Sequence, residues 1–300
     1  MEQKAHQLSV RGPHASYARR MSEQTMAGRV VLVTGASDGI GAETARTLAA
    51  KGATVHVTGR SAAKLGPVAE EVGTEPLVAD FSRLEDVRQL AEQVGERVEK
   101  LDLVLNNAGG TFVPSDTTPD GHEPNFQINH LSPFLLTNLL RPQLAAAGTS
   151  LVLNTSSVGN LMGKIVLDDL DYQHRRAIQL PAYGTGKLMN IVFTRGITQR
   201  WSGDGVVSAA VHPGAVGSSF GRDSRFFGVI YRSPLKRVIA ISIPDGAAPL
   251  IALAERGPDP EIDGRYFSRF KADGRENSQA SDQSVIDGLW ERSAALVGVA

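Results

Sequence analysis

The sequence has no cysteine among its 300 residues, which excludes disulfides, thiolate metal sites and cysteine nucleophiles. None of the seven histidines forms an HxH or HxxxH pair, so no metal site is expected. No run of about 18 uncharged apolar residues occurs, and the first residues lack the apolar core of a signal peptide. The 31 basic and 32 acidic residues leave a net charge of -1, which gives no field that would attract nucleic acid or an anionic membrane. These absences favour small-molecule chemistry and predict a cytoplasmic protein without a transmembrane segment.

Apolar, β-branched runs alternate with helical patterns from about residue 29 onward. Such alternation predicts a parallel sheet covered by helices on both faces. We therefore expect an α/β fold with a single doubly wound Rossmann domain, whose sheet has about seven strands in the order 3-2-1-4-5-6-7. The expected strands are 30–33, 54–57, 75–79, 101–105, 150–154, 206–211 and 264–267, and the expected helices are 42–51, 62–72, 84–98, about 121–146, 181–201 and 281–296.

Residues 1–26 are polar and show no apolar period, which predicts a disordered extension or a stretch added by an upstream start. Residues 27–300 are expected to form the one domain. Two segments, 158–180 and 217–244, break its regular rhythm. Long connections in a compact α/β domain are often lids or pocket walls.

A glycine-rich turn, Thr34-Gly-Ala-Ser-Asp-Gly-Ile-Gly41, lies directly after the first strand and opens the first helix. Glycines at that place permit a tight turn and let the backbone approach a pyrophosphate at the helix N-terminus. The alternative is a purely structural glycine turn. After the second strand, Arg60 stands near the position of the usual acidic ribose-binding residue, and a guanidinium can pair with a 2′-phosphate. This favours NADP(H) over NAD(H), although Asp38 in the turn counts against a phosphate nearby and Arg60 could be simply solvated.

Polar residues also follow the next strands. Asp80 can bind the adenine amino group or cap the helix that begins near Ser82. We expect Asn106 to brace neighbouring strands and Asn107 to face the cofactor. Ser157 is preferred over its neighbour Ser156 as the hydroxyl that binds a substrate oxygen.

The sixth strand ends in His212-Pro-Gly-Ala215. Pro213 and Gly214 are expected to shape the nicotinamide pocket, whereas a histidine before proline is interpreted as a packing residue. The carboxyl ends of six successive strands thus carry candidate residues, and that edge of an open parallel sheet is where ligands bind.

Tyr183 and Lys187 are four residues apart on an expected helix, so they share one face. An ammonium near a phenol favours its ionised form. Moving a tyrosine pKa from about 10 toward 7 takes roughly 4 kcal/mol, which one charge about 4 Å away supplies at an effective dielectric of about 20. A phenol tuned in this way can act as general acid or base.

The glycine turn, Asn106-Asn-Ala-Gly109, the serine after strand five, Tyr183-x-x-x-Lys187 and Pro213-Gly214 together resemble the short-chain dehydrogenases/reductases over residues 28–298. Within that superfamily, Phe126-Gln-Ile-Asn-His-Leu131, Asp168-Asp-Leu170 and the C-terminal Leu289-Trp-Glu-Arg-Ser293 are similar to the retinol-dehydrogenase-like branch. The 26 residues from Ser157 to Tyr183 fit the insert of that branch.

The resemblance implies an oxidoreductase that moves hydride between NADP(H) and a hydrophobic ketone, aldehyde or secondary alcohol. It implies a tetrad in which Tyr183 exchanges the proton, Ser157 holds the carbonyl oxygen, Lys187 binds the nicotinamide ribose and lowers the tyrosine pKa, and Asn129 braces a water relay. Gly186 replaces the usual serine before the lysine, and Ser218 stands where a threonine usually contacts the carboxamide. The residues expected to contact the cofactor are Gly35, Ser37, Asp38, Gly39, Ile40, Gly41, Arg60, Asp80, Phe81, Asn107, Ala108, Gly109, Tyr183, Lys187, Pro213, Gly214, Val216 and Ser218.

The segment 217–244 falls where this superfamily places its substrate lid. Its aromatic and branched residues suit a hydrophobic substrate; a helix packed on its own domain and a basic membrane-surface patch are the alternatives. A homodimer is expected from the resemblance alone. Two other functions stay open: a nucleotide-sensing Rossmann protein without turnover, and another NADP-linked reaction such as epimerisation or enone reduction.

Overall fold

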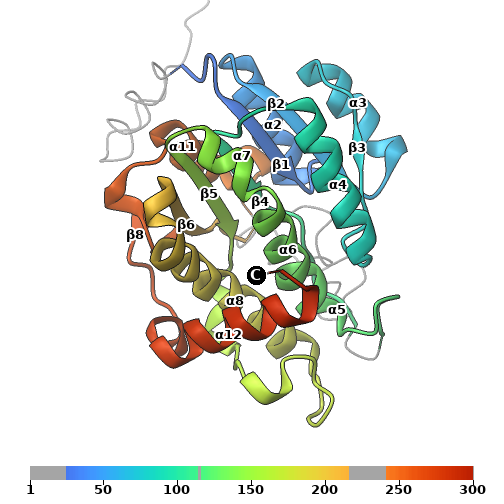
Figure 1. Ribbon diagram of the computed structural model, residues 1–300, viewed down its shortest axis with the longest axis vertical. Coiled ribbons are helices and arrows are strands. Elements are labelled where there is room, and N and C mark those ends of the chain that lie inside the picture. Colours follow the sequence, from blue (N-terminus) through green and yellow to red (C-terminus); the bar gives the residue numbers. More distant parts are fainter. Residues whose placement is uncertain (1–24, 114–115, 216–240, 300) are drawn as a thin grey trace, which may run out of the picture.

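The computed structural model of the protein describes residues 25–113, 116–215 and 241–299. These residues form one eight-stranded sheet in the order β3-β2-β1-β4-β5-β6-β7-β8 (Figure 1). Strands β1 to β7 run parallel, and β8 pairs antiparallel with β7. The predicted Rossmann sheet is confirmed, and β8 adds one strand to the predicted seven. The strands are β1 (Val30–Thr34), β2 (Thr54–Gly59), β3 (Leu77–Val78), β4 (Leu103–Asn106), β5 (Ser150–Thr155), β6 (Val206–His212), β7 (Arg265–Ser268) and β8 (Lys271–Ala272).

Helices connect the strands and cover both faces of the sheet. The α-helices are α2 (Gly39–Ala50), α3 (Ala62–Val72), α4 (Leu84–Arg97), α5 (Pro124–Phe126), α6 (Ser132–Leu139), α7 (Arg141–Ala146), α8 (Gln179–Trp201), α11 (Ile243–Arg256) and α12 (Gln283–Val297). A π-helical turn, η1 (Gln127–Leu131), joins α5 to α6. The 3-10 turns are η2 (Val158–Met162), η3 (Leu167–Asp169), η4 (Ser202–Asp204), η5 (Pro260–Ile262) and η6 (Ser278–Ser281).

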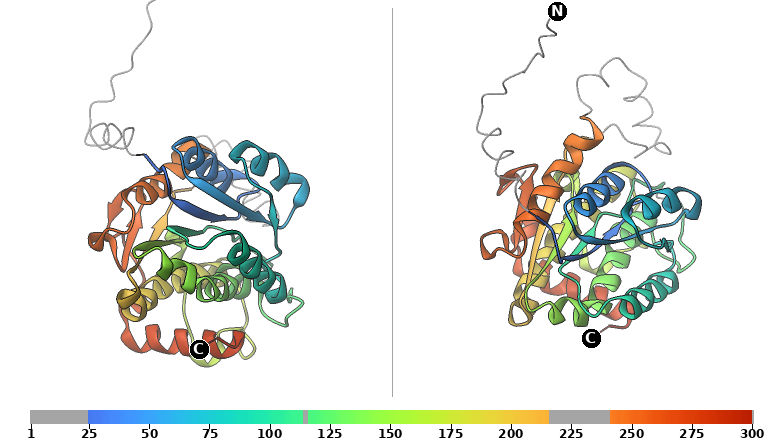
Figure 2. Two further views of the ribbon diagram at one scale, coloured as in Figure 1. Left: turned by 45° about the horizontal axis from the view of Figure 1, so that its top comes forward. Right: turned by 90° about the horizontal axis from the view of Figure 1, so that it is seen from above.

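The two faces of the sheet carry two separate apolar cores. Along β1, Val31 and Val33 join the core beneath α2, α3 and α11, whereas Leu32 joins the core beneath α4, α6, α8 and α12. This follows from the alternation of side chains along a strand. Helix α12 packs along α8 in Figure 1, and α11 lies beside α2 in Figure 2. Burial on both faces explains why the strands read as continuous apolar runs.

Helix α11, like β8, is an element that the sequence pattern did not predict. Pro244 falls in its first turn and Pro249 lies inside it, and both read as helix breakers in sequence. A proline in the first turn replaces an N–H that has no partner there anyway. Ser242 caps this helix, since its hydroxyl accepts from the Asp245 N–H (3.2 Å). Pro249 and Leu250 are both buried, and Leu250 belongs to the core on this face of the sheet, so packing stabilises the helix despite the proline.

The first described residues already belong to the packed fold. Met26 is fully buried, and its N–H donates to the carbonyl of Lys51 (2.9 Å). The packing therefore starts one residue before the predicted boundary at 27. Residues 1–24 lie outside the described residues, and so do residues 217–240 of the expected lid.

Candidate active site

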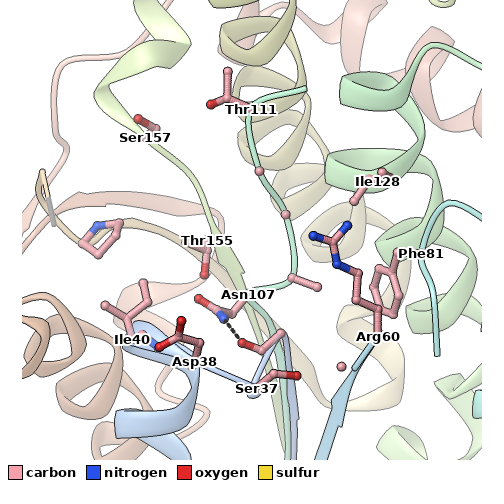
Figure 3. Close-up of a pocket in the computed structure, with 18 of the residues that line it drawn as sticks. Ser37, Asp38, Ile40, Arg60, Phe81, Asn107, Thr111, Ile128, Thr155 and Ser157 are labelled. Atoms are coloured by element: carbon pink, nitrogen blue, oxygen red, sulfur yellow. Dashed lines mark hydrogen bonds between the residues drawn. The ribbon is translucent and has the colours of Figure 1, made fainter. Parts of the chain in front are cut away.

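A single cleft, called the main cleft below, runs over the carboxyl ends of strands β1 to β6 (Figure 3). It brings together side chains from segments far apart in the sequence. Its lining consists of Gly35, residues 37–41, 59–61, Lys64, residues 79–81, 107–112, Ile128, residues 155–157, Tyr183, Lys187 and residues 212–214. All described members of the predicted site therefore line it except Asn129, which lies behind the wall.

The glycine turn forms the floor of one end of the main cleft. Gly35 has a left-handed φ of 66°, which favours glycine. A Cβ on Gly41 would lie 2.4 Å from the Gly35 carbonyl oxygen, so the start of α2 can pack against the turn only without a side chain. The Asp38 carboxylate caps α2 by accepting from the Gly39 N–H (2.7 Å). The turn thus presents a helix N-terminus to the main cleft.

Two neighbouring asparagines at the end of β4 have different partners: Asn107 holds the glycine turn, and Asn106 braces β4 against β5 and α6. Thr34 Oγ1 accepts from the backbone N–H groups of Asn107 (3.0 Å) and Ala108 (2.9 Å). The Asn107 amide donates to the carbonyls of Thr34 (2.9 Å) and Gly35 (3.3 Å; dashed line in Figure 3). Asn106 is buried and donates to Asn154 and Thr137 (both 2.9 Å), which is the bracing role expected for it.

The end of the main cleft beyond β2 is basic. Arg60 and Lys64 are exposed, line the main cleft, and pair with no residue in the part of the chain that the structure describes. Lys64 was not among the site residues predicted from the sequence. It lies in the first turn of α3, where the helix dipole disfavours a cation. A lysine at that position indicates an anion-binding role, and this is the signal by which the sequence could have revealed it.

Asp80 lies at the same end. Its Oδ1 accepts from the Ser82 N–H (2.9 Å), but α4 begins at Leu84 with Arg83 as its N-cap, so Asp80 does not cap this helix. Phe81 beside it is buried and lines the main cleft.

The two serines after β5 have different environments. Ser156 Oγ donates to the carbonyl of Lys187 (2.7 Å) and is buried. Ser157 is half-buried, and its Oγ accepts from the Gly159 N–H (3.1 Å) at the start of η2. The Ser157 hydroxyl therefore keeps its proton available for a ligand in the main cleft.

Tyr183 and Lys187 meet the main cleft from α8, and both are buried, at 7% and 3% exposure. Lys187 Nζ lies 5.8 Å from the centre of the Tyr183 ring and donates to the Thr155 carbonyl (3.2 Å). Burial lowers the pKa of Lys187 from 10.5 to about 8. The ammonium is thus still the main form at pH 7, next to the phenol.

Asn129 lies in the π-helical turn η1 and is fully buried. Its amide donates to the Gly110 carbonyl and accepts from the Gly110 N–H (both 3.0 Å). A Cβ on Gly186 would come within 2.9 Å of the Asn125 carbonyl oxygen and 3.1 Å of Asn129 Cβ. The replacement of serine by Gly186 therefore lets α8 pack closely against this turn.

His212 is an unsuitable proton donor. Burial and the nearby Arg269 guanidinium lower the pKa of His212 to about 4, so the ring is neutral at pH 7. Pro213 and Gly214 line the main cleft, and Gly214 has a left-handed φ of 105°. Val216 and Ser218 lie outside the described residues.

Several lining residues were missed by the sequence analysis besides Lys64: Thr111, Phe112, Ile128 and Thr155. No group of three or more His, Asp or Glu side chains in residues 25–113, 116–215 and 241–299 could hold a metal ion. Within the same ranges, no helix combines the length and apolarity needed to span a membrane.

A doubly wound sheet with a glycine turn and a buried Tyr-Lys pair at its carboxyl edge defines a nucleotide-dependent oxidoreductase fold. The short chain dehydrogenase profile matches residues 29–225. The chain belongs to this short-chain dehydrogenase/reductase family, whose members bind NAD(P), and it is retinol-dehydrogenase-like.

Two curated relatives and one solved structure illustrate this kinship. Human retinol dehydrogenase 13 is 35% identical over 93% of this chain and 87% of its own length. A protein proposed to be the daunorubicin C-13 ketoreductase DnrU, from Streptomyces sp. (strain C5), is 37% identical over 90% of this chain and 93% of its own. The crystal structure of an uncharacterised protein from Mycobacterium paratuberculosis superimposes with a TM-score of 0.75 at 30% identity, over 93% of this chain and 97% of that one.

Proposed function

We propose that the protein is an NADP(H)-dependent carbonyl reductase or alcohol dehydrogenase for hydrophobic ketones, aldehydes or secondary alcohols, with Tyr183 as the general acid/base. The observation that carries this proposal is the buried Tyr183-Lys187 pair facing the main cleft beside Ser157. Relatives named as retinol dehydrogenases and as a ketoreductase support an apolar alcohol or ketone as substrate.

The residues of the main cleft fit a dinucleotide. The backbone of the glycine turn and of residues 107–109 would hold its pyrophosphate and ribose. Ser37 Oγ is buried with no partner among the described residues, so it can bond to the ligand at this end. Arg60 and Lys64 would pair with a 2′-phosphate, because a guanidinium and an ammonium both bind phosphate and neither is engaged within the described residues. This favours NADP(H) over NAD(H).

When bound, the nicotinamide supplies or accepts the hydride. Tyr183 would donate its phenolic proton to the oxygen of a carbonyl substrate, and would take a proton back from the hydroxyl of an alcohol substrate. Ser157 donates a hydrogen bond to the same oxygen and orients it. The Lys187 ammonium, whose Nζ lies 5.8 Å from the centre of the Tyr183 ring, stabilises the phenolate that remains. Asn129 fixes the backbone of Gly110 beside the reacting groups.

Purified protein should oxidise NADPH in the presence of hydrophobic ketones or aldehydes, followed by the loss of NADPH absorbance. Tyr183→Phe should lower kcat by about a hundredfold to ten-thousandfold, since it removes the proton donor, while the Kd for NADPH stays within about twofold of wild type. Tyr172→Phe is the matched control, because its hydroxyl bonds to Thr185 Oγ1 (2.9 Å) and does not line the main cleft. Wild-type turnover by Tyr183→Phe would refute the assignment.

A further inference from the structure

Thr111 carries polar groups that the fold leaves without partners. Within residues 25–113, 116–215 and 241–299, neither its N–H, its C=O nor its hydroxyl forms a hydrogen bond. The residue is only 5% exposed, and Oγ1 is buried. A buried polar group without a partner is costly, and native structures retain few of them. A buried hydroxyl without a partner, next to an N–H and a C=O of the same residue that also lack partners among the described residues, indicates a place in the main cleft where a ligand bonds.

The residues on either side of Thr111 are held firmly by two asparagines. Asn129 makes two hydrogen bonds to the backbone of Gly110, through its carbonyl oxygen and its amide (both 3.0 Å). Asn125 does the same for Phe112, accepting from its N–H (3.0 Å) and donating to its C=O (3.2 Å). Both asparagines are fully buried and stand one helical turn apart. They act on the chain as a neighbouring strand would.

The hydrogen bonds to Gly110 and Phe112 also fix the direction in which the peptide groups of Thr111 point. The peptide groups of successive residues in an extended chain point to opposite sides. Because Gly110 and Phe112 turn theirs toward α5 and η1, those of Thr111 face away from that helical segment. Thr111 lines the main cleft with Ser157 and Tyr183, and Figure 3 shows it and Ser157 at the end away from Ser37 and Arg60. Its unpartnered groups therefore belong to the reacting end of the main cleft.

We propose that Thr111 is a specificity-determining residue whose N–H, C=O and hydroxyl bind a second oxygen function close to the reacting carbon of the substrate. A hydroxyl group suits this position best, because it donates to the C=O of Thr111 and accepts from the N–H. This inference rests on the proposed function and narrows it to hydroxyketones and the corresponding diols. A site built to bond a hydroxyl discriminates strongly against an analogue that lacks it.

The test compares two ketones of nearly equal shape, 2-hydroxyacetophenone and propiophenone, in which a hydroxyl replaces a methyl group. In wild type, kcat/KM with NADPH should favour the hydroxyketone. Thr111→Val keeps the shape of the side chain and should lower that preference about tenfold, because it removes one of the three groups that bond to the substrate hydroxyl. Thr111→Ser restores the hydroxyl and should keep the preference within about threefold of wild type. Intrinsic differences between the ketones cancel in the comparison of variants.

Two results would overturn the proposal. One is an unchanged preference in Thr111→Val; the other is a raised KM for NADPH with the preference intact, which would assign Thr111 to the cofactor. If wild type reduces neither these ketones nor any other, the proposed function fails. The role of Thr111 is then tested by calorimetry, which measures the binding of both ketones to the NADPH complex. In this measurement Thr111→Val should still lose the preference for the hydroxyketone. Equal binding of both ketones by wild type would refute it.

Discussion

The two ends of the main cleft are lined by different kinds of chemical groups. At the end proposed to hold the nucleotide, called the nucleotide end below, backbone groups and closely packed glycines form the lining, as at Gly35 and Gly41. At the proposed reacting end, buried polar side chains line the main cleft, and Lys187 is the extreme case. Adding atoms at the nucleotide end should therefore weaken cofactor binding and lower the stability of the protein. Removing polar atoms at the reacting end should lower the activity and can even raise the stability of the protein.

Lys187→Met tests the reacting end with the largest expected effect on stability. The unfolded lysine has a pKa near 10.5 and the folded one about 8, so the fold bears the full cost of the buried charge below pH 8. That gap corresponds to roughly 3 kcal/mol. At pH 7 the free energy of unfolding of the variant, measured by urea titration, should exceed that of wild type by up to about this energy. The lost hydrogen bond to Thr155 offsets part of the gain. Turnover of the variant should collapse.

The pH profile supplies the control. In wild type, stability should rise as pH increases from about 8 to 10.5, because the unfolded chain then binds the additional proton. This rise should disappear in Lys187→Met. A variant that is less stable at pH 7, or that keeps the same slope, would show that Lys187 is a structural residue.

This contrast also explains what the sequence could predict. The sheet was predictable, because strands buried on both faces are continuous apolar runs, and so was the glycine turn, which is a local motif between β1 and α2. Helix α11 was missed because its prolines mask a helix that tertiary burial stabilises. The choice of Ser157 over Ser156 depends on a bond from Ser156 to Lys187, and the role of Thr111 depends on Asn125 and Asn129. These partners are distant in sequence, so no local pattern reveals them.

Gly41→Ala tests the nucleotide end. Its Cβ would lie 2.4 Å from the Gly35 carbonyl oxygen and 2.5 Å from Asn107 Nδ2, so the turn must open. We expect a loss of about 1–3 kcal/mol in the free energy of unfolding, measured by urea titration, together with weaker NADPH binding. Gly66→Ala is the matched control, because nothing lies within 4 Å of its Cβ and it lies inside α3. That change should stabilise the protein by about 0.5–1 kcal/mol. Equal effects of the two substitutions would remove the distinction between the two ends.

Arg60→Ala is the smallest of these tests and the one that separates charge from backbone at the nucleotide end. If Arg60 pairs with a 2′-phosphate, its loss should raise the Kd for NADPH about tenfold and leave that for NADH nearly unchanged, as measured by fluorescence titration. Arg83→Ala removes the same charge from an exposed arginine that does not line the main cleft, so it controls for the general field of the protein. The Arg60 effect should also shrink at high salt, because exposed charges are screened. Equal losses for both cofactors would refute the pairing of Arg60 with a 2′-phosphate, and an unchanged Kd for NADPH would mean that Arg60 is only solvated.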